Sequence, residues 1–316
     1  MLKLALALTL VATAAQAQPY IGYLGSSSAA SDAARTDAFR KGLTELGYIE
    51  GKNIRVEWRY PEGKPERLAE IANEFATRKV QLIVVSGATA TQAVKKRLGS
   101  TPIVMTNVSD PVGLGIVGSL AKPGGNITGL SNISPELGAK RLELLKEIVP
   151  KLSTVAVLGD PGSPAHAPQA KELEAAARTV GLQLRFMEVR RADDLDAAFD
   201  AIAQIRAGAL VAMQNPTITR LRTRLAELAA KARLPAMYPQ DEFVDAGGLI
   251  SYGPDIPDLH RQAAYFVDKI LKGAKPADLP VEQPRKFELA INVKSARQIG
   301  LALPQQLLFR ADRTVD

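Results

Sequence analysis

The chain has 316 residues, 46% of them hydrophobic and 23% charged, which is the balance of a soluble globular protein of one or two domains. It contains no cysteine, which excludes disulfides, thiolate metal sites and cysteine nucleophiles. The formal net charge of +7 comes from 40 basic and 33 acidic residues that are scattered or in short groups. This pattern favours a solvated surface over a nucleic-acid interface.

Residues 1–17 have the pattern of a secretory signal peptide. One basic residue, Lys3, precedes an apolar run at 4–15, and Ala15-Gln16-Ala17 matches the small-x-small cleavage pattern. The apolar run is short for a bilayer span, and no later run is long enough for one. We therefore expect an exported, periplasmic chain that starts at residue 18 and is not inserted into a membrane. Because no cysteine follows the signal, we expect no lipid anchor.

Strands and helices alternate over the next hundred residues. Apolar or alternating runs predict strands at 20–24, 53–60, 82–85, 102–105 and 126–130, and helical spacing predicts helices at 32–46, 65–78 and 90–97. Small polar loops follow three of the strands, at 25–28, 86–89 and 106–110. Because the carboxyl ends of parallel strands meet at one edge of a sheet, we expect these loops to form one rim of a cleft.

The third of these loops contains Ser109 and ends at Asp110. Asp110-Pro111 predicts the start of a further helix, with the aspartate as its cap and proline at the first helical position. Alternatively, Asp110 receives the ammonium group of a ligand. The G-x-G-x-x-G match at 113–118 lies beyond this helix start, and no strand with a terminal acid follows at the right distance, so we expect no dinucleotide or other cofactor.

A second α/β unit follows. Helices are predicted at 135–148, 169–180, 193–206 and 220–232, and strands at 154–158, 183–189, 209–213 and 235–238. Polar residues at its strand ends could close over a ligand or serve their own loops: Asp160, Ser163, Asn215, Tyr238 and Glu242. Tyr238 would offer an aromatic face and a hydroxyl, which suit a ring or an apolar side chain.

The C-terminal segment is too short for a third domain. It predicts a strand at 249–252, a helix at 258–271, a strand at 286–291 and a short helix at 295–299, which must return to the earlier units. The predicted fold class is α/β, with two Rossmann-like lobes joined by a multi-strand hinge. The first lobe would take 18–129 and about 252–285, and the second 130–251 and about 286–316.

Five segments carry a resemblance to a known family. Residues 38–63, 103–131, 140–150, 243–259 and 267–296 resemble the ABC-transporter substrate-binding proteins of the tryptophan/tyrosine type, and the likeness covers essentially the whole mature chain. The chain departs from the family at 159–163, where relatives often have asparagine-rich sequence. The resemblance implies a periplasmic-binding-protein fold of type I with three crossovers. It also implies a small ligand between the lobes, such as an aromatic amino acid, and an inner-membrane permease as partner.

The binding hypothesis assigns one chemical role to two loops of the first lobe. Hydroxyl and N–H groups of the first loop would hold a ligand carboxylate, and the N-terminal dipole of the helix after the second would favour the same charge. The residues concerned are Ser26, Ser27 and Ser28 in the first loop, and Ala88, Thr89 and Ala90 in the second. The expected ligand is a small zwitterion or carboxylate, bound by hinge closure of a monomer.

Other functions are less well supported by the sequence. His166 and His260 are the only histidines, and neither has a metal-like partner at helical spacing; His166 could touch the ligand or lie on the surface. A ligand-sensing domain of a signalling system would use the same lobes. A secreted α/β enzyme would have to rely on carboxylates alone. We expect no metal, no nucleic acid and no catalysis.

Overall fold

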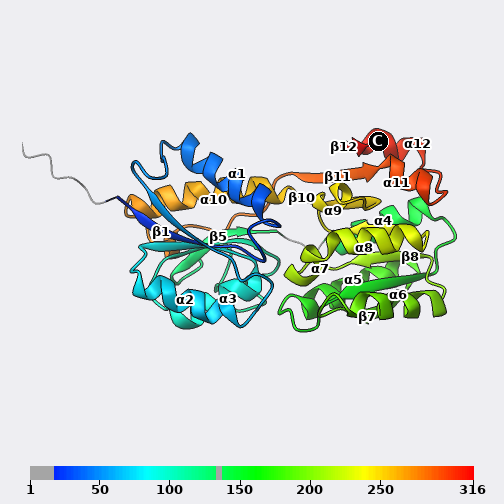
Figure 1. Cartoon of the computed structure of the whole chain (residues 1–316), viewed down its shortest axis with the longest axis horizontal. Coiled ribbons are helices and arrows are strands. Elements are labelled where there is room, and N and C mark those ends of the chain that lie inside the picture. The colour runs from blue at the N-terminus through cyan, green and yellow to red at the C-terminus, as the bar shows by residue number, and fades with distance from the viewer. Residues whose placement is uncertain (1–17, 133–136) are drawn as a thin grey trace, which may run out of the picture.

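The computed structural model describes residues 18–132 and 137–316, which form two α/β lobes lying side by side (Figure 1). The predicted signal peptide and the first residues of the helix predicted at 135–148 lie outside the described residues. None of the described helices is both long and apolar enough to span a membrane.

The first lobe contains a five-stranded parallel sheet in the order β2-β1-β3-β4-β5. Its strands are β1 (Tyr20–Leu24), β2 (Arg55–Arg59), β3 (Leu82–Ser86), β4 (Ile103–Val108) and β5 (Ile127–Ser131). Its helices are α1 (Ala33–Glu45), α2 (Arg67–Thr77), α3 (Ala88–Arg97) and α10 (Ile256–Leu271). Figure 1 shows α1 and α10 on one face of this sheet and α2 and α3 on the other.

Successive residues of a strand point to opposite faces, which explains these two layers. On β3, Val84 packs in the cluster that includes α1 and α10, and Val85 packs in the cluster that includes α2 and α3. Both side chains are fully buried. Strands buried on both faces have the continuous apolar sequence from which they were predicted.

The second lobe contains a seven-stranded sheet in the order β12-β11-β10-β9-β8-β6-β7, in which only the β10–β11 pair is antiparallel. Its strands are β6 (Thr154–Gly159), β7 (Gln183–Glu188), β8 (Ala209–Ala212), β9 (Ala236–Tyr238), β10 (Ile250–Pro254), β11 (Phe287–Asn292) and β12 (Arg313–Val315). One face carries α4 (Gly138–Ile148), α5 (His166–Val180), α11 (Val293–Gln298) and α12 (Gln305–Arg310). The other carries α6 (Asp194–Gln204), α7 (Pro216–Arg220), α8 (Arg222–Lys231) and α9 (Glu242–Asp245).

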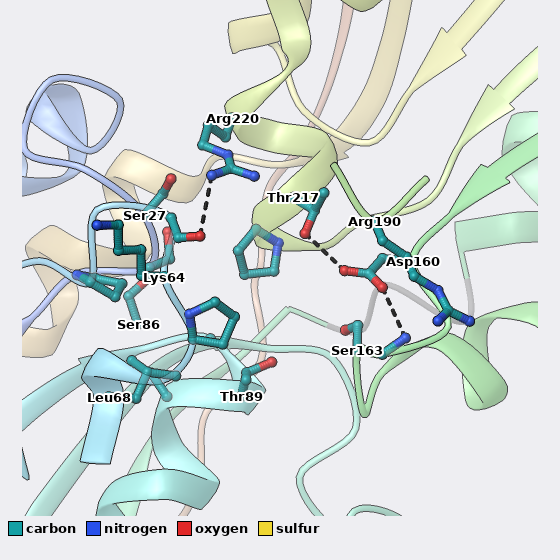
Figure 2. Close-up of a pocket in the computed structure, with 18 residues that line it drawn as sticks. Ser27, Lys64, Leu68, Ser86, Thr89, Asp160, Ser163, Arg190, Thr217 and Arg220 are labelled. Atoms are coloured by element: carbon teal, nitrogen blue, oxygen red, sulfur yellow. Dashed lines mark hydrogen bonds between the residues drawn. The ribbon is translucent and has the colours of Figure 1, made fainter. Parts of the chain in front are cut away.

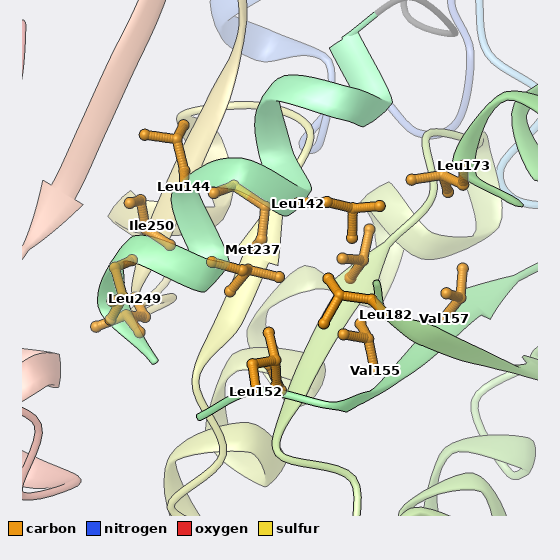
Figure 3. Close-up of a cluster of buried hydrophobic side chains, with 14 of the residues drawn as sticks. Leu142, Leu144, Leu152, Val155, Val157, Leu173, Leu182, Met237, Leu249 and Ile250 are labelled. Atoms are coloured by element: carbon orange, nitrogen blue, oxygen red, sulfur yellow. The ribbon is translucent and has the colours of Figure 1, made fainter. Parts of the chain in front are cut away.

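Leucines of α4 form the centre of one core of this lobe. Leu142 and Leu144 are buried in the same cluster as Val155 and Met237 of the sheet, as Figure 3 shows. Burying apolar side chains of this size contributes about 1.5–3 kcal/mol each. The packing of α4 therefore holds the start of the second lobe firmly against its sheet.

Between the elements that the structure describes, the chain passes from one lobe to the other three times. β5 is followed by α4, and β10 is followed by α10. After η2 (Pro276–Asp278), the N–H groups of Val281 and Glu282 donate to Leu120 and Gly129 of the first lobe, before β11 enters the second sheet. The predicted fold class, with two lobes and several connecting segments, is confirmed. β5 extends two residues and β10 three residues past the predicted lobe limits of 129 and 251.

The prediction of a helix after Asp110-Pro111 is wrong. Residues 111–115 form consecutive turns, in which Gly113 donates its N–H to Asp110 Oδ1 at 2.8 Å. Gly115 has a φ of 63°, in the left-handed region, and this ends any right-handed helix. The helix predicted at 220–232 is α8, which begins two residues later than predicted, and the short helix α7 before it was not predicted.

Candidate functional site

A cavity of about 300 Å³ lies between the lobes, where the loops after β1 and β3 face the loops after β6 and β8 (Figure 2). A narrower cavity of about 30 Å³ adjoins it, because Ser26, Thr89, Ser163 and other residues line both. The cavities therefore lie at the carboxyl ends of parallel strands, the position at which open α/β sheets bind ligands.

Most of the predicted site residues line one or both cavities. These are Ser26, Ser27, Ala88, Thr89, Ala90, Ser109, Asp160, Ser163 and Asn215. Four others do not line them: Ser28, Asp110, Tyr238 and Glu242. The polar strand ends thus come together as expected, but the part that each residue plays differs from the prediction in several cases.

Asp32 and Ser31 already accept from the backbone N–H groups of the serine loop. This buried aspartate accepts from Ser26 N at 2.6 Å and from Ser27 N at 3.2 Å, while Ser28 N donates to Ser31 Oγ at 3.1 Å. The expectation that these N–H groups hold a ligand carboxylate is wrong, because the chain supplies that carboxylate itself. The Ser27 hydroxyl is buried and has no partner among the described residues, so it alone stays open to a ligand.

The N-terminus of α3 is open to both cavities. Ala88, Thr89 and Ala90 form its first turn, and no side chain caps it. Gly87 begins the helix with a φ of 85°, a conformation that favours glycine, and its own N–H donates to Thr106 O at 2.8 Å. The first N–H groups of a helix lack intrahelical partners and carry its positive end. This turn can therefore bind an anion such as a carboxylate.

Asp160 supplies a carboxylate from the opposite lobe. Its two oxygens accept from Gly162 N at 2.9 Å and from Thr217 Oγ1 at 2.8 Å (Figure 2). Both donors are neutral, and within the described ranges no lysine or arginine nitrogen lies within 4.0 Å of it. A carboxylate that faces a cavity without a counter-ion can receive an ammonium group. Asn215 instead caps α7, since its side chain accepts from Ile218 N at 2.9 Å.

Asn107 joins the two lobes in the narrow cavity. It lies at an irregularity of β4 between Met105 and Val108 and has a φ of 56°, which asparagine tolerates better than most residues. Its Oδ1 accepts from Gln214 Nε2 of the other lobe at 2.6 Å. A bulge of this kind redirects a side chain, here toward the opposite lobe. The sequence predicted a loop at this position and gave no sign of its role, because the bulge depends on pairing with β5.

Arg35 of α1 is a second residue that sequence analysis missed. It is 3% exposed, and its guanidinium donates to Ser26 Oγ at 3.0 Å, to Gln240 Oε1 at 3.3 Å and to Glu242. Although burial alone would lower the pKa of Arg35, the charges of Glu242 and Asp32 raise it above its ordinary value. Glu242 is thus held in an ion pair between the lobes and does not line a cavity.

Tyr238 belongs to the core of the second lobe. Its side chain is 0% exposed, and its ring stacks on Phe243 with 5.0 Å between the centroids. The prediction that Tyr238 offers its ring to a ligand is therefore wrong. Burial raises the pKa of its phenol, whose oxygen has no partner within the described part of the chain. His166 is also absent from the cavity walls, and its ring meets Phe186 edge-on.

The chain is similar to known proteins over nearly its whole length. A family model described as ABC transporter substrate binding protein matches residues 27–315. A protein of Clostridioides difficile (strain R20291) described as a tyrosine-binding protein is 26% identical over 267 residues, which are 83% of this chain and 75% of that protein.

The chain is also similar to solved structures over nearly its whole length. A conserved domain protein from Vibrio cholerae has a TM-score of 0.89 at 28% identity, over 94% of this chain and 100% of that one. An ABC domain in complex with L-Trp from Streptococcus pneumonia has a TM-score of 0.89 at 25% identity, over 95% of this chain and 100% of that one. A ligand-free, open substrate-binding protein from Clostridium difficile shares the fold, with a TM-score of 0.68 at 22% identity over 94% and 99% of the two chains.

Proposed function

We propose, since the chain belongs to the ABC transporter substrate-binding proteins, that it captures a small amino-acid-like ligand between its lobes and delivers it to an inner-membrane permease. The descriptions of two relatives name tyrosine and L-Trp, which supports an amino acid as the ligand class. The predicted signal sequence supports export to the periplasm, and the proposed working form is a monomer.

One observation carries this proposal. The first lobe presents the uncapped N-terminus of α3 to the cavity, and the second lobe presents the carboxylate of Asp160 without a counter-ion. The first suits a carboxylate and the second suits an ammonium group. A zwitterion that bridges the cavity would therefore bind both lobes at once, with its carboxylate at Thr89 and its ammonium group at Asp160.

Closure of the lobes about the three connecting segments would complete the site. In the present arrangement the lobes bond directly, through Gln214 to Asn107 at 2.6 Å and through Arg220 Nη1 to Gly63 O at 3.2 Å. A ligand with partners in both lobes stabilises this closed form by its difference in affinity for the closed and open forms. The permease would then receive the closed, loaded protein.

Thermal unfolding with pools of amino acids, aromatic acids, nucleosides and sugars tests the proposal. A ligand that binds only the native state adds about 2.7 kcal/mol to the free energy of unfolding at a hundredfold excess over its Kd. We expect a saturable rise in Tm with amino acids. A rise confined to sugars or nucleosides would refute the ligand class.

Mass spectrometry of the protein, denatured before and after incubation, completes this test. It identifies a ligand that co-purifies and therefore hides a shift in Tm. Recovery of the added ligand unchanged separates binding from turnover, and so distinguishes a binding protein from the carboxylate-dependent enzyme. A steady conversion of the ligand would overturn the transport function.

A further inference from the structure

We infer that the ligand carries a second anionic group, a carboxylate or a phosphate on its side chain, in place of the aromatic ring of tyrosine or tryptophan. The inference rests on the proposed function and deepens it by naming the chemistry of the ligand side chain. It is drawn from the charged and apolar groups in the wall of the 300 Å³ cavity.

The cavity wall has more positive than negative charge. It includes Lys64, Arg190 and Arg220, against the single carboxylate of Asp160. Arg190 has a counter-ion, since it pairs with Glu188 at 3.0 Å. No carboxylate oxygen of the described residues lies within 4.0 Å of Lys64 or Arg220. When the ammonium group of a zwitterion neutralises Asp160, Lys64 and Arg220 still have no anionic partner.

Lys64 and Arg220 belong to the same part of the wall. Arg220 Nη1 donates to the carbonyl of Gly63, the residue before Lys64, at 3.2 Å (Figure 2). Gly63 has a φ of 71°, and a Cβ at this position would come within 1.9 Å of Arg220 Nη1, so a glycine is required for this approach. Figure 2 shows these groups and Ser27 at one end of the cavity and Asp160 and Ser163 at the other.

The groups at this end have unused hydrogen-bond donors. Arg220 Nε and the hydroxyl of Ser27 are buried without a partner in the described part of the chain. A guanidinium with free N–H groups matches the geometry of a carboxylate or phosphate, and a nearby ammonium strengthens the attraction. A buried donor without a partner costs free energy, which an anionic ligand group would recover.

The apolar part of the wall does not supply a partner for an aromatic ring. Among the described residues, no phenylalanine, tyrosine or tryptophan lines either cavity, and the apolar side chains are alanines together with Pro61, Pro65, Leu68 and Pro216. Aromatic ligands gain affinity from offset-stacked or edge-to-face contact with other rings. The wall thus suits the methylene groups of an acidic side chain, with the anion beyond them at Lys64 and Arg220.

Isothermal titration calorimetry with matched pairs tests the inference. The pairs are L-glutamate with L-glutamine, L-aspartate with L-asparagine, and O-phospho-L-serine with L-serine, and L-tyrosine and L-tryptophan are measured beside them. We expect the acidic member of at least one pair to bind about tenfold or more tightly than its neutral partner. A comparison of the phosphoserine pair with the glutamate and aspartate pairs shows whether the second anion is a phosphate or a carboxylate.

Two variants test whether Lys64 and Arg220 cause the preference for acidic ligands. Lys64→Gln and Arg220→Gln should each reduce the acidic-to-neutral affinity ratio about tenfold. The ratio is measured within each variant, so a change in folding or lobe closure cancels. Lys96→Gln removes the same charge from the exposed last turn of α3 and should leave the ratio unchanged.

The outcomes separate this inference from the proposed function. Tighter binding of tyrosine or tryptophan than of any acidic compound would overturn the inference and leave an amino-acid-binding protein. A preference for acidic compounds that survives both variants would also overturn it. Failure of every amino acid, with a response to sugars or nucleosides, would refute the proposed function itself.

Discussion

Arg35 of α1 and Glu242 of α9 form an ion pair between the two lobes, and Gln240 accepts from the same guanidinium at 3.3 Å. Arg35 also meets Asp32 of its own lobe at 3.3 Å. If the lobes separate, Arg35 loses Glu242 and Gln240 but keeps Asp32. Under the proposed hinge closure, the pair would stabilise the closed arrangement and leave Arg35 paired with Asp32 in the open one.

Glu242→Gln should weaken ligand binding about tenfold. The change removes a charge-assisted contact that only the closed form makes, worth about 1.5–3 kcal/mol in a buried setting, so the ligand must supply more of the closing free energy. Isothermal titration calorimetry measures the affinity, and small-angle scattering should show a larger radius of gyration without ligand. Glu227→Gln, the same change on the exposed surface of α8, is the control. An unchanged affinity and radius would show that the ion pair does not influence closure.

Asp160→Asn should reduce the affinity for an α-amino acid about tenfold to a hundredfold, because the ammonium group loses its carboxylate. Asparagine still accepts hydrogen bonds, so the loop can keep its contact with Thr217. The α-hydroxy analogue of the same ligand, which has no ammonium group, should bind the variant and the parent protein alike. Equal losses for both compounds would mean that Asp160 only supports its loop. Asp196→Asn, which makes the same change at an exposed side chain of α6, is the matched control.

The stability of the protein should fall as the pH drops from about 6.5 to about 4. Burial, aided by the charge of Arg35, lowers the pKa of His260 from 6.5 to about 4. Its Nδ1 donates to Ile256 O at 3.0 Å, which leaves Nε2 to accept from Thr106 Oγ1 at 3.0 Å and Ser86 Oγ at 3.2 Å.

The sign follows from proton uptake. Between these pH values the unfolded state binds a proton at His260 that the folded state does not, so the free energy of unfolding decreases by about 1.4 kcal/mol per pH unit from this group. Urea unfolding across pH 4–8 should show a shallower decline for His260→Gln. Parallel curves for the two proteins below pH 6.5 would contradict the assignment.

Tyr238→Phe should leave ligand affinity unchanged and leave Tm unchanged or raised. The phenol oxygen is buried without a partner among the described residues, so its removal relieves a desolvation cost. Tyr60→Phe is the matched comparison, because the Tyr60 hydroxyl lies 2.9 Å from Thr36 Oγ1 and its loss should lower Tm. A large loss of affinity in Tyr238→Phe would restore Tyr238 to the binding site.

Local patterns were sufficient for the fold. Apolar runs such as 82–85 and 154–158 predicted buried strands, and their alternation with helices predicted parallel sheets in two lobes. The helix after Asp110 was wrong, because the aspartate that favours a cap also closes a turn on Gly113. A capped helix and a turn closed by aspartate begin with the same residue, and the glycines that follow Asp110 favour the turn.

The site was predicted only in part, because local patterns reveal the loops and not the residues that they contact. Strand-end loops are recognisable in a sequence, so Thr89, Asp160 and Ser163 were found. The partners of these loops are not recognisable, since Arg35 meets Glu242, and Asn107 meets Gln214, only after the lobes have folded. Tyr238 shows the limit most clearly: its place at a strand end suggested a ligand contact, and Phe243, five residues later, binds its ring instead.

The position of α10 determines the order in which the protein can be completed. This helix covers the face of the first sheet that holds Ile21, Tyr23 and Val84, yet it follows β10 of the second lobe in the chain. During synthesis α1 can cover this face only in part, and α10 completes the cover once the second lobe is almost finished, so the first lobe is completed late.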